Sequence, residues 1–227
     1  MSTPTSVVFK RLKMFWHAPL LNKLHNLSNF YYMVKGVVLY RLVFKEFGSG
    51  SYIRKPLLVW NPGYVSIGER VSIRDGVRME VVLSTKHRTP SLAIGNDTNI
   101  EQNVHIVCHS RVHIGSNVTI TGNCSIADVT HPFSDVHDPR KIGARIQDDD
   151  SFVEIGDRTF IGYGSVILPN VRIGTNAVIG ANSVVMHDVP DYAVAAGVPA
   201  VVVKRYDFEK GIWVKTRSCS KAPTIQQ

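Results

Sequence analysis

The chain has 227 residues, of which 44% are hydrophobic and 19% are charged, which is the composition of a globular protein. Its three cysteines are too few and too scattered for a disulfide framework, so a disulfide-dense secreted fold is excluded. The most apolar stretch, residues 30–44, is short and is interrupted by Lys35 and Arg41, so a membrane-spanning helix is not expected. No small-residue cleavage site follows an apolar run, and we therefore expect a cytoplasmic protein without a signal peptide.

The excess positive charge lies in the N-terminal quarter of the chain. Residues 1–55 contain nine Lys or Arg and one acidic residue, which accounts for the whole net charge of +8. The segment is also rich in aromatic residues, and it is expected to form helices that end at the Gly48–Gly50 turn. Two interpretations stay open: the helices cap the rest of the protein or pack in an oligomer, or they contact an anionic membrane. Nucleic-acid binding is not expected, because no recognition motif accompanies the charge.

A repeat of six residues fills the C-terminal half of the chain. Aliphatic residues recur in phase at Ile155, Ile161, Ile167, Ile173, Ile179 and Val185. A six-residue period fits neither a helical stripe nor an alternating strand. It is typical of a hexapeptide β-helix, in which three short strands make one triangular coil and the coils stack. The fold class predicted is therefore an all-β solenoid, a parallel β-helix of hexapeptide repeats.

The same phase identifies the limits of the solenoid. Hexads begin at Ile67, and the period is lost over residues 127–152, which are polar and charged and are predicted to form a protruding loop. The domains predicted are a basic, aromatic-rich helical segment at 1–55, the β-helix at 56–206, and a frayed tail at 207–227.

Three features together resemble a known family. They are the hexads, the Thr130-His131-Pro132 sequence in the loop, and the Ala196-Gly197-Val198-Pro199-Ala200 ending. Over roughly residues 60–205 the chain resembles the left-handed β-helix acyltransferases, in particular the maltose, galactoside and nodulation O-acetyltransferases and their relatives in polysaccharide gene clusters. The resemblance implies a left-handed β-helix, a homotrimer with active sites between neighbouring subunits, acetyl-CoA as acyl donor, and no metal.

The resemblance also implies roles for individual residues. His131 would be the general base that takes the proton of a sugar hydroxyl as it attacks the thioester. Glu101 stands where relatives place an Asn that contacts the acceptor. Apart from the resemblance, Asp128 lies three residues before His131, where it would orient the imidazole and bind substrate, or instead fix a turn of the loop. Six residues would contact the cofactor: Gly162, Tyr163, Gly180, Ala181, Lys204 and Arg205. Among these, the backbone N–H of Tyr163 would stabilise the oxyanion, and Lys204 and Arg205 would lie near the CoA phosphates.

The function expected is acetyl transfer to a sugar hydroxyl, in a surface-polysaccharide precursor. The basic N-terminal segment adds the hypothesis that the acceptor is lipid-linked at the inner membrane face. Three alternatives remain: N-acylation of an amino-sugar nucleotide, a non-catalytic β-helix scaffold, and a γ-class carbonic anhydrase. The last would use histidines such as His105, His109 and His113 on zinc, although outward-pointing strand residues are poorly placed for it.

Overall fold

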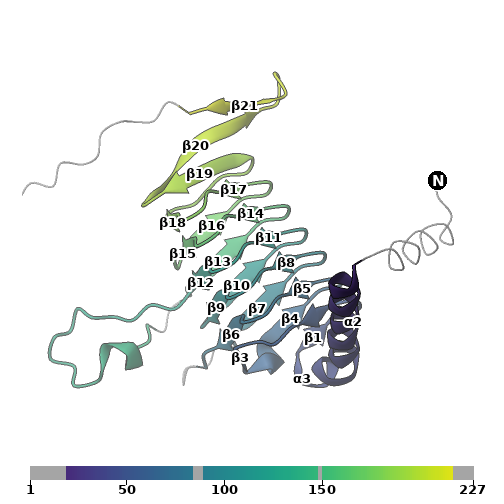
Figure 1. The fold of residues 1–227 in the computed structure, drawn as a ribbon. Coiled ribbons are helices and arrows are strands. Elements are labelled where there is room, and N and C mark those ends of the chain that lie inside the picture. Colours follow the sequence, from purple (N-terminus) through teal and green to yellow (C-terminus); the bar gives the residue numbers. More distant parts are fainter. Residues whose placement is uncertain (1–18, 84–88, 148–149, 217–227) are drawn as a thin grey trace, which may run out of the picture.

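The computed structural model describes residues 19–83, 89–147 and 150–216, and these form a parallel β-helix with a helical segment at one end and a hairpin at the other (Figure 1). Sheet A contains six strands: β1 (Glu46–Phe47), β4 (Val65–Ile67), β7 (Ser91–Ile94), β10 (Arg111–Ile114), β13 (Phe152–Ile155) and β16 (Val171–Ile173). Sheet C also contains six: β3 (Leu58–Trp60), β6 (Arg78–Val81), β9 (His105–Cys108), β12 (Ser125–Ala127), β15 (Val166–Ile167) and β18 (Val184–Val185).

Sheet B is the longest of the three and includes the C-terminal hairpin. Its strands are β2 (Tyr52–Ile53), β5 (Ser72–Ile73), β8 (Asn99–Ile100), β11 (Thr119–Ile120), β14 (Phe160–Ile161), β17 (Val178–Ile179), β19 (Ala193–Gly197), β20 (Ala200–Asp207) and β21 (Ile212–Lys215). Two short 3-10 helices, η2 (Pro62–Tyr64) and η3 (Ile142–Ala144), lie outside the sheets. Each turn of the chain visits sheets A, B and C in order, which confirms the hexapeptide solenoid.

The core is a column of stacked aliphatic side chains. In sheet B, Ile73, Ile100, Ile120, Ile161 and Ile179 lie in register on successive strands and are fully buried. Parallel strands stack about 4.8 Å apart, so each of these side chains contacts its equivalents on the coils above and below. The hexad repeat therefore exists because every coil must present the same apolar surface to its neighbours.

The helical segment covers the first coil of the β-helix. It consists of α2 (Leu20–Lys35), the π-helical turn η1 (Gly36–Tyr40) and α3 (Arg41–Val43). Beside it Tyr40, Phe44 and Phe47 form a buried aromatic cluster with ring centroids 5.4 Å apart. A Cβ atom on Gly36 would lie 2.8 Å from the Phe47 ring, so glycine permits this close contact. The described part of the segment thus packs against the first coil through Gly36, Tyr40 and Phe44.

Two of the predicted domain boundaries are wrong. The β-helix begins before residue 56, because β1 and β2 already pair with β4 and β5 in the parallel register of the stack. The first coil was missed because the two glycines of Gly48–Gly50 suggested a linker. At the other end, residues 212–215 form β21, which pairs with β20, where a frayed tail was expected. Residues 217–227 of that tail, and residues 1–18 of the N-terminal segment, lie outside the described residues.

None of the helices in the described ranges has both the length and the apolar character needed to cross a bilayer.

Two cysteines belong to the solenoid core, and their reactivity is a test of the packing. Cys108 and Cys124 are 0% and 1% exposed, and burial raises the pKa of both thiols, that of Cys108 to about 12. Because the thiolate is the reactive form, we expect Cys108 in the native protein to react with Ellman's reagent about a thousandfold more slowly than an exposed thiol. Stopped-flow absorbance with and without denaturant measures this. Fast native reaction of two or more of the three thiols would contradict the packing.

Candidate active site

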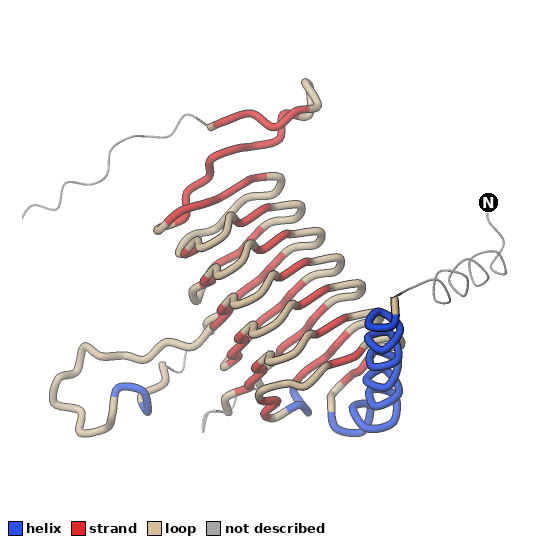
Figure 2. The backbone as a smooth tube through the Cα atoms, in the orientation of Figure 1, coloured by secondary structure: helices blue, strands red, loops and turns tan. Residues whose placement is uncertain are grey.

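A long loop leaves the β-helix between β12 of sheet C and β13 of sheet A. It extends away from the solenoid and contains η3, the one helical turn in its described part (Figures 1 and 2). The loop replaces the tight corner that joins these sheets in other coils, and residues 148–149 of it lie outside the described residues. The prediction that the break in the hexad phase marks a protruding loop is confirmed.

His131 lies near the start of this loop with an exposed side chain. Its Nδ1 atom is 2.9 Å from the carbonyl oxygen of Arg145. A carbonyl oxygen can only accept a hydrogen bond, so Nδ1 is the protonated nitrogen of the neutral ring. The other nitrogen, Nε2, then has its lone pair free to take a proton. This is the tautomer that a general base requires.

Arg145 organises the loop around His131. Its guanidinium group is buried and donates hydrogen bonds to the carbonyl oxygens of Asp135, Asp138 and Arg140, at 2.7–3.0 Å. The Arg145 Nε also lies 3.5 Å from the Asp138 carboxylate. One side chain therefore fixes the backbone of the loop while its own carbonyl orients His131. Sequence reasoning missed Arg145, because a single arginine in an aperiodic polar loop carries no pattern that separates it from a solvated one.

Asp128 is buried at a corner of the solenoid, as expected of a residue that fixes a turn. Its side chain is fully buried, and its two carboxylate oxygens accept hydrogen bonds from the backbone N–H groups of His109, Ser110 and Arg111 at 2.6–2.8 Å. Burial raises the pKa of this carboxyl, and the three N–H donors oppose that shift. Asp128 thus stabilises the widened corner between β9 and β10. In this chain its buried carboxylate contacts neither His131 nor the solvent, so these contacts fit the turn role and not the substrate-binding or orienting role.

The corner role of Asp128 predicts a loss of stability on substitution. Asp128→Ala leaves three N–H groups without their acceptor, two of them buried, and we expect the free energy of unfolding to fall by about 2–4 kcal/mol. Urea unfolding followed by circular dichroism measures this change. The activity per folded molecule should stay within about twofold of the wild type. An Asp128→Ala protein of wild-type stability would contradict the assignment.

Four of the predicted cofactor residues lie along one edge of the prism, between sheets B and C. Gly162-Tyr163 follows β14, and Gly180-Ala181 follows β17 at the same corner one coil later. The N–H of Gly162 donates to Ile179, and a Cβ atom on Gly162 would lie 2.5 Å from the backbone nitrogen of Ala181. Glycine at this position is therefore required by the close approach of successive coils, whether or not a ligand is bound.

The edges of the prism differ in how their corner N–H groups are satisfied. At the corner between sheets A and B, the N–H of Ser116 donates to Asp157, and the N–H of Thr175 donates to Asp191. At the corner between sheets B and C, no hydrogen bond within the described residues uses the N–H of Tyr163 or of Ala181. These two donors are available for a ligand, and such donors can stabilise an oxyanion or bind a carbonyl group.

The remaining predicted residues lie on the same face or edge. Glu101 follows β8 at the corner between sheets B and C, where its carboxylate is 3.7 Å from Arg74 in the preceding coil. Lys204 and Arg205 are exposed on β20, where they pair with Val194 and Ala193 at the start of β19. Gly197 is the last residue of β19, at the end of the strand nearer Gly180. Lys204 and Arg205 lie about 10–13 Å from Gly197, toward the other end of that strand.

A single chain does not bring the base and the cofactor edge together. The loop of His131 arises at the corner between sheets C and A, whereas Gly162, Tyr163, Gly180 and Ala181 lie at the corner between sheets B and C. The full width of sheet C separates the two edges. The candidate site therefore consists, within one chain, of two half-sites on different edges.

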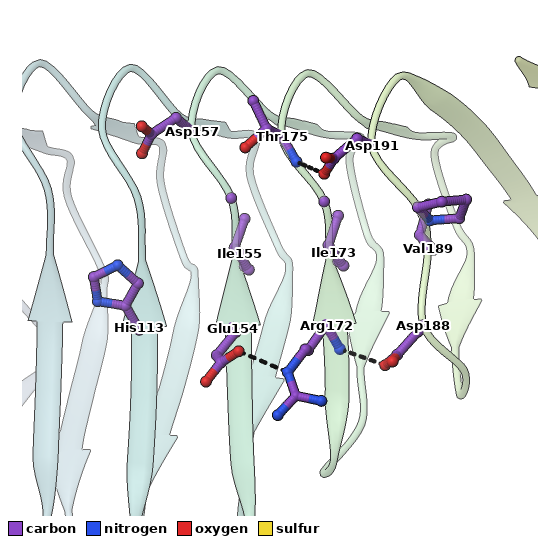
Figure 3. A pocket seen from close by; sticks show the side chains of 13 residues that line it. His113, Glu154, Ile155, Asp157, Arg172, Ile173, Thr175, Asp188, Val189 and Asp191 are labelled. Carbon is purple, nitrogen blue, oxygen red and sulfur yellow. Dashed lines mark hydrogen bonds and ion pairs between the residues drawn. The ribbon is translucent and has the colours of Figure 1, made fainter.

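A separate groove of about 800 Å³ lies on sheet A (Figure 3). Arg172 crosses it, with its Nε 2.8 Å from Glu154 and its backbone N–H donating to Asp188. The carboxylate of Asp191 accepts the Thr175 N–H at 2.7 Å. These charged groups form hydrogen bonds and ion pairs with one another or with backbone N–H groups, and no residue of the predicted site lines the groove. We therefore place the candidate active site elsewhere.

The histidines considered for zinc binding do not converge. His105 is on sheet C, His113 is on sheet A, and His109 is buried in the corner between them with its Nδ1 3.3 Å from the carbonyl oxygen of Val82. Within residues 19–83, 89–147 and 150–216, no group of three or more His, Cys, Asp or Glu side chains is arranged to hold a metal ion.

Comparison with known proteins agrees with the hexapeptide fold. Residues 152–187 match the bacterial transferase hexapeptide family (six repeats). The chain is 30% identical over 199 residues to WbbJ of Escherichia coli K12, a protein named for O-acetyl transfer in lipopolysaccharide biosynthesis, and the match covers 86% of this chain and 97% of WbbJ. The chain belongs to the hexapeptide-repeat acetyltransferases.

One further relative and one solved structure are similar to this acetyltransferase. It is 40% identical over 127 residues to the galactoside O-acetyltransferase of Escherichia coli K12, a match that covers 55% of this chain and 60% of that enzyme. Among solved structures, the N-acyltransferase AntD of Bacillus cereus, in complex with dTDP and 3-hydroxybutyryl-CoA, superposes with a TM-score of 0.61 at 22% identity. The superposition covers 76% of this chain and 88% of AntD, and it shows the shared left-handed β-helix fold.

Proposed function

We propose that the chain is an acetyl-CoA-dependent O-acetyltransferase that acetylates a sugar hydroxyl with His131 as general base. The observation that carries the proposal is the bond from His131 Nδ1 to the Arg145 carbonyl, which leaves Nε2 ready to accept a proton. As Nε2 takes the hydroxyl proton, the sugar oxygen attacks the thioester carbonyl carbon, and the free Tyr163 N–H stabilises the oxyanion. Cleavage of the C–S bond then releases CoA, whose sulfur takes the proton back from the imidazolium.

The two half-sites support a homotrimer with shared active sites. Sheet C lies between the His131 edge and the Gly180 edge. Its outward side chains toward the C-terminus are mostly apolar, with His105 and Ser125 beside Val107, Ala127, Val166, Leu168 and Val184. Sheet A instead carries an outward network of Arg111, Glu154 and Arg172. If sheet C faces a three-fold axis, the His131 loop of each subunit meets the Gly180 edge of the next. Gly162, Gly180 and Ala181 would border acetyl-CoA there, with Lys204 and Arg205 toward its phosphates.

The acceptor class is supported by the relatives. WbbJ, which the chain matches over nearly its whole length, is named for lipopolysaccharide biosynthesis, and the galactoside O-acetyltransferase is named for a sugar substrate. The proposed acceptor is therefore a sugar hydroxyl in a surface-polysaccharide precursor, lipid-linked at the inner face of the membrane. Glu101, on the same edge as Gly180, would contact this acceptor by accepting a hydrogen bond from one of its hydroxyls.

The chemistry is tested by thiol release from acetyl-CoA with a panel of free sugars, nucleotide sugars and lipid-linked sugars. Acceptor-dependent release, with an acetyl ester on the product, is the expected result. Release only with amino-sugar nucleotides, giving an amide, would replace the proposal with N-acylation. Failure of the protein to bind CoA in calorimetry would favour the scaffold alternative.

The shared site is tested by subunit complementation. His131→Ala removes the base, and Ala181→Trp places a bulky ring on the exposed cofactor edge; each variant alone is expected to be inactive. When the two are unfolded and refolded together in equal amounts, about one quarter of intersubunit sites combine an intact loop with an intact edge. Recovery of about a quarter of the wild-type activity is therefore expected. If the mixture stays inactive although mixed oligomers form, the site is contained within one chain.

A further inference from the structure

We infer that the outward face of the N-terminal helical segment binds the surface of an anionic lipid bilayer. The face is defined by an apolar stripe along α2, η1 and α3, whose members are 44–80% exposed: Leu20, Leu24, Leu27, Tyr31, Val34, Val38 and Leu42. Exposed apolar side chains in a continuous row are rare on a protein surface that contacts only water. The stripe is therefore a surface for a partner.

The spacing of the stripe shows that it is one continuous surface. Its members alternate at steps of three and four residues from Leu20 to Val38, which places them on one side of a helix. The last step, from Val38 to Leu42, is four residues where three would follow the alternation. The π-helical turn of η1, Gly36–Tyr40, has a longer repeat and accounts for the extra residue.

The β-helix occupies the opposite side of the same segment. Asn29 accepts a hydrogen bond from Arg54 at 2.8 Å, the Arg54 guanidinium lies over the Tyr32 ring, and Gly36 and Tyr40 pack beside Phe47. The segment is thus fixed to the solenoid by one face while the stripe faces away from it. Capping the solenoid does not require an apolar stripe on the far side.

Charge identifies the occupant as an anionic surface. Residues 19–45 contain Lys23, Lys35, Arg41 and Lys45 and no acidic residue. Helices that pair with each other through an apolar stripe normally place complementary charges beside it, and a second copy of this segment would bring only more cations. Anionic headgroups neutralise these cations while the apolar side chains enter the interface, with the helix lying in the membrane plane. The inference does not depend on the identity of the acceptor or on the chemistry at His131.

The test is sedimentation of the purified full-length protein with lipid vesicles. We expect binding to vesicles of phosphatidylglycerol and phosphatidylcholine at low salt, much weaker binding to phosphatidylcholine alone, and release by high salt. The double substitution Leu24→Glu, Leu27→Glu is expected to weaken binding to the anionic vesicles by about tenfold or more. The matched control, Leu57→Glu with Ile212→Glu, makes the same change of charge at exposed apolar positions outside the stripe. Apart from the loss that the added negative charge causes in both variants, the control should bind the anionic vesicles within about twofold of the wild type.

Three outcomes would overturn the inference. The first is a wild-type protein that does not sediment with anionic vesicles. The second is an equal loss of binding in the stripe variant and the control, which would assign the effect to net charge alone. The third is a stripe variant that keeps its lipid binding but has a smaller mass in light scattering, which would show that the stripe is covered by a second copy of the chain.

Discussion

Replacement of His131 with alanine is expected to lower kcat for acetyl transfer by about 10²–10⁴-fold. The hydroxyl of a sugar is a weak nucleophile, and the variant lacks the imidazole that would take its proton as the new C–O bond forms. The structure gives this imidazole a fixed tautomer through the 2.9 Å contact with the Arg145 carbonyl. Binding of acetyl-CoA should change little, because the variant alters none of the six residues that are proposed to border the cofactor. Thiol release and calorimetry measure the two effects separately.

The matched control is His137→Ala in the same loop. His137 is exposed, and its backbone N–H donates to Asp135, so the variant removes an imidazole without removing a described contact of the ring. Its kcat should stay within about twofold of the wild type. Equal kcat for His131→Ala and the wild type would show that the base is another residue, and a large loss in His137→Ala would point to that side chain.

Replacement of Arg145 with alanine is expected to lower kcat by about 10–100-fold, with a smaller effect on the KM for acetyl-CoA. The guanidinium group holds three loop carbonyls, and without it the backbone that orients His131 is no longer fixed. Displacement of a catalytic group by about 1 Å can cost 10²-fold in rate. Arg145 is thus a positioning residue, and its loss should leave the solenoid intact. Steady-state kinetics and thermal unfolding of the same preparation measure the two properties.

Two further measurements separate positioning from general damage to the loop. Guanidinium ion added to Arg145→Ala should restore part of the activity, because it can occupy the same buried position. Arg145→Lys should remain impaired, since one ammonium group cannot reproduce the planar set of donors. The control is Arg140→Ala, whose exposed side chain pairs only with Asp138 among the described residues. Failure of guanidinium rescue together with a large drop in the unfolding temperature would contradict the positioning role.

The fold was predictable because every coil of a solenoid repeats the same structure, so the sequence has a regular period. Ile155, Ile161 and Ile167 belong to sheets A, B and C in turn, and counting hexads therefore assigns each residue to a sheet and each glycine to an edge. The break in the period marked the loop of His131 for the same reason. The first coil escaped because the glycines between β1 and β2 suggested a boundary there, and its aromatic residues resemble those of the helices before it.

The contacts inside the loop could not be predicted in the same way. Asp128 and Asp135 have the same chemistry in the sequence, yet one is buried under three N–H donors and the other lends its carbonyl to Arg145. Nothing periodic distinguishes them, because the loop folds around its own polar groups and not against a repeated neighbour. The sequence therefore left a turn role and an active-site role open for Asp128, and Arg145 was missed for the same reason.

The edge between sheets B and C has a further consequence for the size of what this protein can hold. Glu101, Thr121, Gly162, Gly180 and Ala196 follow one another there, each on a successive coil that is linked to the next by backbone hydrogen bonds. Neighbouring residues along this edge are roughly 4.8 Å apart, and Glu101 lies three coils from Gly180. A change of length comes only in whole coils, such as the eighteen residues from Gly162 to Gly180. On the proposed assignment, the distance between an acceptor at Glu101 and a cofactor at Gly180 can therefore change only in steps of one coil.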